Sequence, residues 1–158
     1  MPAPEAQLHA SRPLLALAAV AGAGIVALIV AAVVMRYAIS SPFRFTEELA
    51  GLLLASMVFL SIPAVRLADS DIRVTLFTER LGGAARRLAW VTGQLITAGF
   101  FAVLAWEAWG IAAFTTRLGL MSEAARLPLS PFLWLMVAGA ALTALVALVQ
   151  AIRRPPPP

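Results

Sequence analysis

The stretch Leu14–Met35, LLALAAVAGAGIVALIVAAVVM, contains no polar side chain and decides the fold class. An α-helix needs about 20 consecutive apolar residues to cross the hydrocarbon core of a bilayer, and this run, extended to Tyr37, reaches that length. It is too long for the apolar core of a signal peptide, which spans about 7–15 residues. We therefore expect a retained transmembrane helix over 14–37, with Pro13 in its first turn.

Three further apolar runs, at 46–67, 88–114 and 131–152, are also long enough to span a membrane. A segment in lipid must satisfy its own backbone hydrogen bonds, so each run is expected to be helical. With 61% hydrophobic and only 13% charged residues, the chain is too apolar for a soluble domain of 158 residues. The sequence thus predicts an all-α membrane protein, residues 1–158 forming a single integral membrane domain with four transmembrane helices.

The segment 69–81, between the second and third runs, is too short and too charged to span a bilayer. Its apolar side chains fall on one helical stripe, its arginines lie off that stripe, and two aspartates are placed to cap its start. We predict a short cytoplasmic interfacial amphipathic helix over about 70–81. The residues that define it are Asp69, Asp71, Arg73, Val74, Phe77 and Leu81.

The basic residues set the expected orientation. All twelve are arginines, against eight carboxylates, and they stand at the ends of the apolar runs rather than in one patch with aromatic residues, so we expect no nucleic-acid partner. Cytoplasmic loops carry an excess of arginine, which places both termini in the cytoplasm. The cytoplasmic side would hold Arg12, Arg66, Arg73, Arg80, Arg86, Arg87, Arg153 and Arg154, and the opposite side Arg36, Arg44, Arg117 and Arg126.

Redox and metal chemistry lack their usual ligands in this sequence. The chain contains no cysteine, which excludes disulfides, iron–sulfur clusters and thiol catalysis, and its only histidine is His9, in a polar tail. No phosphate-binding glycine loop or nucleophile–histidine spacing is present. We expect no catalytic centre, no metal and no cofactor, and hence no enzyme.

Glu107 is the only carboxylate well inside an apolar run, which makes it a candidate ion or proton site. It lies between Trp106 and Trp109, so we expect it at the outer membrane interface, hydrated or paired with an arginine such as Arg117. A contact with another subunit is the alternative role.

Glu47 and Glu48 form a carboxylate pair at the start of the second run, preceded by Thr46, which can cap the helix. Adjacent helical residues point about 100° apart, so the pair cannot share a proton as a catalytic dyad would. The expected roles are stabilisation of the helix start by its dipole, or an ion pair with Arg44, Arg36 or a partner subunit.

Two patterns predict helix–helix contacts. Ala19, Ala23, Ala27 and Ala31 recur every four residues in the first run, as small residues do where helices approach closely in lipid. Gln94, Thr92 and Thr97 in the third run are expected to make interhelical hydrogen bonds.

The arrangement resembles the small membrane subunit, DctQ-like, of tripartite ATP-independent periplasmic (TRAP) transporters. The resemblance rests on Phe45-Thr46-Glu47-Glu48-Leu49 at the second helix, on the segment Asp69–Val74, and on Leu127-Pro128 before the fourth helix. Ser70-Asp71 stands where that family usually has Glu-His.

The resemblance implies a bacterial inner-membrane complex for sodium-coupled uptake of organic acids. A large permease subunit would carry the sodium and substrate sites, a periplasmic solute-binding protein would deliver the substrate, and this chain would brace the large subunit in the lipid. Glu47, Glu48, Arg44 and Glu107 are its candidate subunit contacts.

Two other functions stay open. The chain could be the small subunit of a tricarboxylate-type tripartite transporter, or a homo-oligomeric exporter that uses Glu107 as a proton carrier. A haem-binding anchor subunit would carry histidines in its spans, and this sequence has none there.

Overall fold

The computed structural model of the chain describes residues 4–38, 43–68 and 82–153. These residues form four α-helices: α1 (Pro4–Ala38), α2 (Thr46–Leu67), α3 (Gly83–Leu118) and α4 (Ser130–Arg153). Each contains a stretch that is long and apolar enough to cross a membrane. The predicted all-α fold with four transmembrane helices is confirmed, and the amphipathic helix predicted over 70–81 lies outside the described residues.

α1 begins earlier than the apolar run suggests. It starts at Pro4 rather than near Leu14, so Pro13 lies inside the helix, and the prediction of a first-turn proline is wrong. The sequence before Pro13 contains alanine, glutamate, glutamine and leucine, which have high helix propensity and carry the helix back to Pro4. Pro13 interrupts only one backbone hydrogen bond of this long helix, because it lacks an N–H.

α2 has the bounds that the apolar run predicts, but its first turn is built differently. Its N-cap residue is Phe45, and no side chain caps the helix start. The Thr46 hydroxyl instead donates a hydrogen bond to the carbonyl oxygen of Phe43, 3.1 Å away. The capping role predicted for Thr46 is therefore wrong, since its hydroxyl is bonded to the residues that precede the helix.

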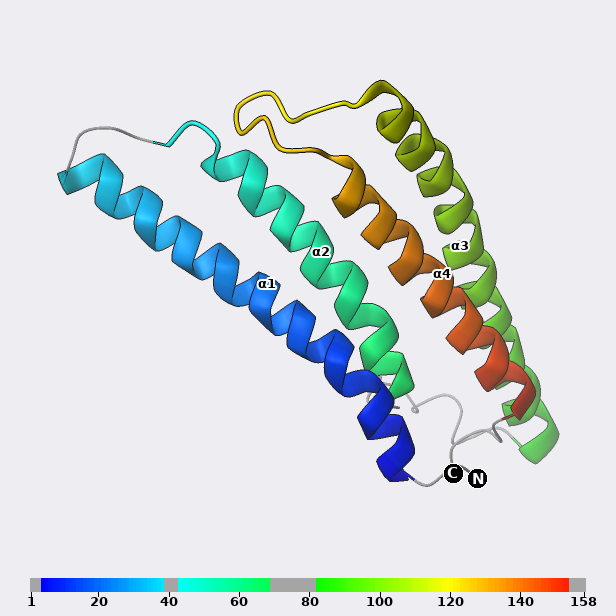
Figure 1. The fold of residues 1–158 in the computed structure, drawn as a ribbon. Coiled ribbons are helices and arrows are strands. Elements are labelled where there is room, and N and C mark those ends of the chain that lie inside the picture. The colour runs from blue at the N-terminus through cyan, green and yellow to red at the C-terminus, as the bar shows by residue number, and fades with distance from the viewer. Residues whose placement is uncertain (1–3, 39–42, 69–81, 154–158) are drawn as a thin grey trace.

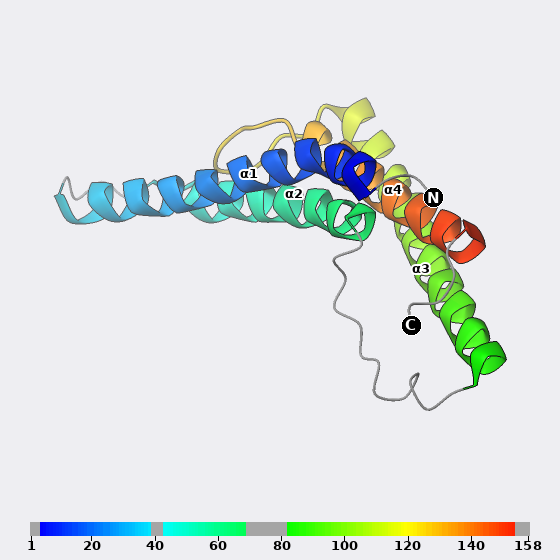
Figure 2. The same ribbon diagram turned by 90° about the horizontal axis from the view of Figure 1, so that it is seen from below.

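The four helices lie side by side in one open layer, in the order α1, α2, α4, α3 (Figure 1). Within the described residues α1 packs only against α2 and α3 only against α4, while the contact between α2 and α4 joins the two pairs. Seen from below, α3 is tilted away from the α1–α2 pair (Figure 2). The two outer helices thus each have one neighbour, and much of their apolar surface is left for lipid or another protein.

The contact between α2 and α4 brings the two backbones close together at one position. Gly139 of α4 lies against the backbone of Phe59, where a Cβ atom would come within 2.9 Å of the Phe59 carbonyl carbon. Thr143, one turn further along, is fully buried, and its hydroxyl donates to the Gly139 carbonyl oxygen at 2.7 Å. Ala140 and Ala147 are also fully buried, so small side chains on α4 allow this approach.

The small-residue contact between α1 and α2 uses a different face of α1 from the predicted one. Ala19, Ala23, Ala27 and Ala31 are all exposed, so the stripe predicted from their spacing is not the packing face. The buried residues in this part of α1 are Ala18 and Ala21, next to Gly22, where a Cβ atom would lie 3.3 Å from the Met57 sulfur. In a helix so rich in alanine, a period of four fits several faces equally well.

The layer has two ends that differ in their polar groups. We call one of them the Arg66 end: α1 and α3 begin there, and α2 and α4 finish there (Figure 1). The opposite end, where α2 begins and the loop 119–129 joins α3 to α4, is the Glu48 end.

Candidate functional site

At the Glu48 end, one carboxylate ties α2 to the loop between α3 and α4. Glu48, in the first turn of α2, accepts hydrogen bonds from the backbone N–H groups of Glu123, Ala124 and Ala125, at 2.8, 3.0 and 3.0 Å. Three consecutive amides that converge on one carboxylate form an anion-binding nest of backbone dipoles. Glu48 thus occupies the nest from within the same chain.

The loop is shaped so that these amides are free to bind Glu48. Gly119, in the left-handed conformation with φ of 60°, ends α3, and the Leu120 N–H bonds back to the Thr115 carbonyl at 3.1 Å. Further along, the Ser122 N–H donates to the Leu127 carbonyl at 2.8 Å, and the Ser122 hydroxyl accepts from the Leu127 N–H at 3.3 Å. These bonds close the loop on both sides of residues 123–125 and leave the three amides pointing at α2.

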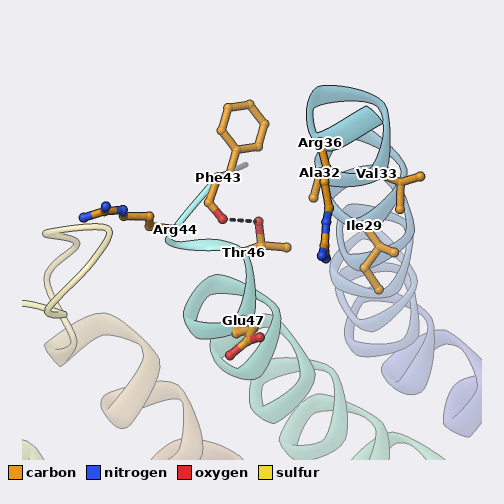
Figure 3. A pocket seen from close by; sticks show the side chains of 8 residues that line it. All are labelled: Ile29, Ala32, Val33, Arg36, Phe43, Arg44, Thr46 and Glu47. Carbon is orange, nitrogen blue, oxygen red and sulfur yellow. Dashed lines mark hydrogen bonds between the residues drawn. The ribbon is translucent and has the colours of Figure 1, made fainter. Parts of the chain in front are cut away.

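The neighbouring carboxylate, Glu47, has a different environment. It lines a pocket of about 480 Å³ between α1 and α2, together with Arg36, Arg44 and Thr46 (Figure 3). Arg36 hangs from α1 beside the pocket, whereas the Arg44 side chain extends away from α1. Among the described residues none of these three charged side chains forms an ion pair, so the pairing expected between the glutamates and Arg36 or Arg44 is absent there.

The remaining wall of this pocket is apolar. Ile29, Ala32 and Val33 of α1 line it, together with Phe43 from the residues before α2. The pocket combines an apolar wall with the charged side chains of Arg36, Arg44 and Glu47.

Glu107 stands apart from both groups. Its side chain is exposed on α3 and forms no hydrogen bond or ion pair with any described residue. The expected pairing with Arg117 is not formed, because the two residues are ten positions apart on one helix, a rise of about 15 Å. α3 continues to Leu118, about 16 Å beyond Glu107 at 1.5 Å per residue, which places the carboxyl group well inside the helix rather than at its end.

At the Arg66 end, one arginine links three helices. The Arg66 guanidinium, near the end of α2, donates to the side-chain oxygen of Gln94 on α3 at 2.5 Å and to that of Gln150 on α4 at 3.4 Å. The Gln150 amide in turn donates to the Arg66 carbonyl oxygen at 2.8 Å. Both glutamines are buried, so this cluster satisfies polar groups that the layer would otherwise leave without partners.

The predicted interhelical hydrogen bond of Gln94 is confirmed, whereas the one predicted for Thr97 is wrong: its hydroxyl donates to the Gly93 carbonyl oxygen of the same helix at 2.9 Å. The sequence indicates only an orientation role for Arg66 and does not reveal the cluster as a whole. The available signal was the position of Gln150, a polar amide inside an otherwise apolar run. Such a residue in a membrane helix usually has an interhelical partner.

Asp69, Asp71, Arg73, Val74, Phe77 and Leu81, the residues that define the predicted interfacial helix, all lie outside the described residues. In the parts of the chain that are described, no three histidine, aspartate or glutamate side chains are grouped so that they could hold a metal ion.

Comparison with known proteins gives one match. The family model described as tripartite ATP-independent periplasmic transporters, DctQ component, matches residues 25–155, from the middle of α1 beyond the end of α4. Neither the curated proteins nor the solved structures contain a match to the chain.

Proposed function

Because the chain belongs to the DctQ family, the small permease component of TRAP transporters, we propose that it is a non-catalytic scaffold for the large permease component. The family match over residues 25–155 carries this proposal. In it, the large component holds the sodium and organic-acid sites, and a periplasmic solute-binding protein delivers the substrate. This chain binds neither sodium nor any cofactor.

The arrangement of the helices supports a scaffold rather than a transport path. A layer in which α1 and α3 each have a single neighbour encloses no passage between its described helices. Three of its buried polar side chains are bonded within the layer: Gln94 and Gln150 to Arg66, and Thr143 to its own helix. Polar groups used in this way hold helices together rather than bind a solute.

Co-purification and reconstitution test the proposal. The affinity-tagged chain, expressed with the large permease component encoded beside it, is expected to recover that component from detergent-solubilised membranes. Liposomes that hold both components, supplied with the binding protein and a sodium gradient, are expected to take up an organic acid. Liposomes that hold either component alone are not.

The exporter hypothesis is tested in the same liposomes. Glu107 is exposed within a membrane helix, and this observation keeps the hypothesis open. Proton-coupled flux through the chain alone, lost in Glu107→Gln, would overturn the scaffold. Recovery of a tricarboxylate-type large subunit instead of a TRAP one would support the other tripartite system.

We also propose that the Arg66 end faces the cytoplasm of a bacterial inner-membrane protein. The arginine excess at this end supports that orientation. Arg86 and Arg87 add to it, since α3 starts at Gly83, about 16 Å before Gln94 at 1.5 Å per residue, and its first turns pass beyond the Arg66 cluster. Reporter fusions after Arg154 and within 119–129 should report cytoplasm and periplasm respectively, and the reverse result would refute the orientation.

A further inference from the structure

One face of α3 combines the marks of a helix-packing seam with a polar group that lipid cannot satisfy. Its residues follow one another at alternating steps of four and three, the 3.5-residue period at which two helices pack side by side. We call this face the Glu107 seam: Ile96, Phe100, Val103, Glu107, Gly110 and Phe114.

Every member of the Glu107 seam is exposed, with Phe100 at 63% and Val103 at 64% of their full accessibility. The seam lies off the face that packs against α4, which holds the buried residues Ala108, Ala112 and Thr115. Since α3 has no other neighbour among the described helices, nothing in the described chain covers the seam.

Glu107 argues that lipid does not cover the seam in the working protein. Its carboxyl group has no partner among the described residues, and α3 continues for about 16 Å beyond it. Hydrocarbon offers no hydrogen-bond donor, so a carboxyl group on a membrane-spanning helix is expected to face protein or water rather than lipid tails. The exposed face of α1 provides the contrast: Val20 and Val30 are 70% and 56% exposed, and no polar side chain occurs between Leu14 and Met35.

Gly110 argues for a helix as the covering element. It lies one turn from Glu107 on the same seam, and a Cβ atom built there would meet nothing within 4 Å. Open space over a glycine lets another helix backbone come close, as small residues do in membrane helix pairs. The phenylalanines at 100 and 114 then provide apolar contacts on either side.

We propose that the large permease component packs a transmembrane helix along the Glu107 seam and directs a cationic or hydrogen-bond-donating side chain at Glu107. The inference rests on the proposed function, which supplies the partner. The unpartnered carboxyl group specifies what that partner must carry, since a buried acid is stabilised by an opposite charge or a donor. The apolar outward face of α1 is left to lipid.

Photo-crosslinking maps the covered face directly. The chain has no cysteine, so a single introduced cysteine is the one site in this chain that can carry a thiol-linked photo-crosslinker. Phe100→Cys and Phe114→Cys on the seam are compared with Val20→Cys and Val30→Cys on α1, in membranes that contain both components. The seam positions are expected to give an adduct with the large component, and the α1 positions are not.

Substitutions test the two chemical features of the seam. Glu107→Leu is expected to lower recovery of the large component about tenfold or more, as removal of one partner of a buried charged pair does. Gly110→Leu is expected to have a similar effect by blocking close approach, while Ala102→Leu, a small-to-large change at an exposed position of α3 away from the seam, is not. Thermal unfolding of each purified variant alone shows that it is folded, which keeps the loss of binding interpretable.

The outcomes separate this inference from the proposed function. Adducts that arise only from the α1 positions, or binding of Glu107→Leu and Gly110→Leu as strong as that of wild type, leave the proposed scaffold function intact as long as the wild-type chain recovers the large component. Either result would refute the contact at the Glu107 seam. Adducts between two copies of this chain at the seam would also overturn it, because the occupant would be a second copy. Failure of the wild-type chain to recover the large component would overturn the proposed function itself.

Discussion

The close approach of α2 and α4 makes Gly139 the position at which the smallest substitution should have the largest structural effect. An added Cβ would lie against the carbonyl oxygen of Phe59, 2.9 Å from its carbonyl carbon and 3.0 Å from its Cβ. Carbon atoms in contact normally lie about 3.5–4.0 Å apart. The obstacle includes backbone atoms of α2, so the strain cannot be relieved by rotating a side chain, and the two helices must separate.

The expected cost follows from a matched pair of substitutions. Overpacking a well-packed contact costs about 1–3 kcal/mol, while Gly→Ala in a helix interior gains up to about 1 kcal/mol of helix propensity. At Gly99 on α3 an added Cβ meets nothing within 4 Å, so Gly99→Ala shows the propensity gain alone. Gly139→Ala should therefore be less stable than Gly99→Ala by about 1–3 kcal/mol, or about 2–4 °C in unfolding temperature per kcal/mol.

Circular dichroism of the purified variants, heated in one detergent, measures the midpoint temperature of unfolding of each. Gly139→Val should lie below Gly139→Ala, and Phe59→Ala should not rescue either, since alanine retains the backbone and the Cβ that cause the clash. Equal midpoints for Gly139→Ala and Gly99→Ala, or rescue by Phe59→Ala, would refute the backbone contact between α2 and α4.

Three further substitutions test the polar contacts. Glu48→Ala should speed hydrogen exchange at the amides of 123–125 about tenfold while the amides of α4 keep their rates; unchanged loop exchange would contradict the anchor. Gln150→Leu removes the two hydrogen bonds between Gln150 and Arg66 and should cost about 1–3 kcal/mol of unfolding free energy; a loss no larger than that of the control Val149→Leu, on the exposed neighbouring position, would exclude a structural role. Thr46→Val removes the hydrogen bond to the Phe43 carbonyl oxygen and should cost about 0.5–1.5 kcal/mol; a change below about 0.5 kcal/mol, as at an ordinary surface position, would contradict a structural role for that contact.

The helices could be predicted from the sequence because lipid leaves the backbone no alternative. Four apolar runs of spanning length must each close their own hydrogen bonds, and the range predicted for the second span, 46–67, coincides with the bounds of α2. The start of α1 could not be read in this way, since hydropathy marks where a helix can lie in lipid but not where it begins in water.

The packing faces were harder to predict, for a physical reason. In a soluble protein the polar face of a helix marks its exterior, but here both faces of α1 are apolar. The four-residue spacing of Ala19, Ala23, Ala27 and Ala31 therefore matched a face of α1 that is exposed in the structure. The buried residues are instead Ala18 and Ala21. The order of the helices depends on such contacts and was equally invisible.

The role of Glu48 was only half visible. The carboxylate pair at residues 47 and 48 marked the start of α2, but the groups that bind Glu48 are backbone amides of a distant loop. Backbone donors leave no trace in a sequence, and only the fold of the loop after Gly119 directs them at α2. The sequence therefore suggests a side-chain partner for Glu48, such as Arg44, that the structure does not supply.

The polar contacts join three helices of the layer into one unit. α2 is joined to the α3–α4 pair at three heights: by Glu48 at one end, by Gly139 in the middle and by Arg66 at the other end. A partner that packs on the outer face of α3 would therefore be attached to a unit of three helices that is joined at both ends and in the middle. This is a second physical reason, independent of the Glu107 carboxyl group, for a scaffold to present α3 to the component that it holds.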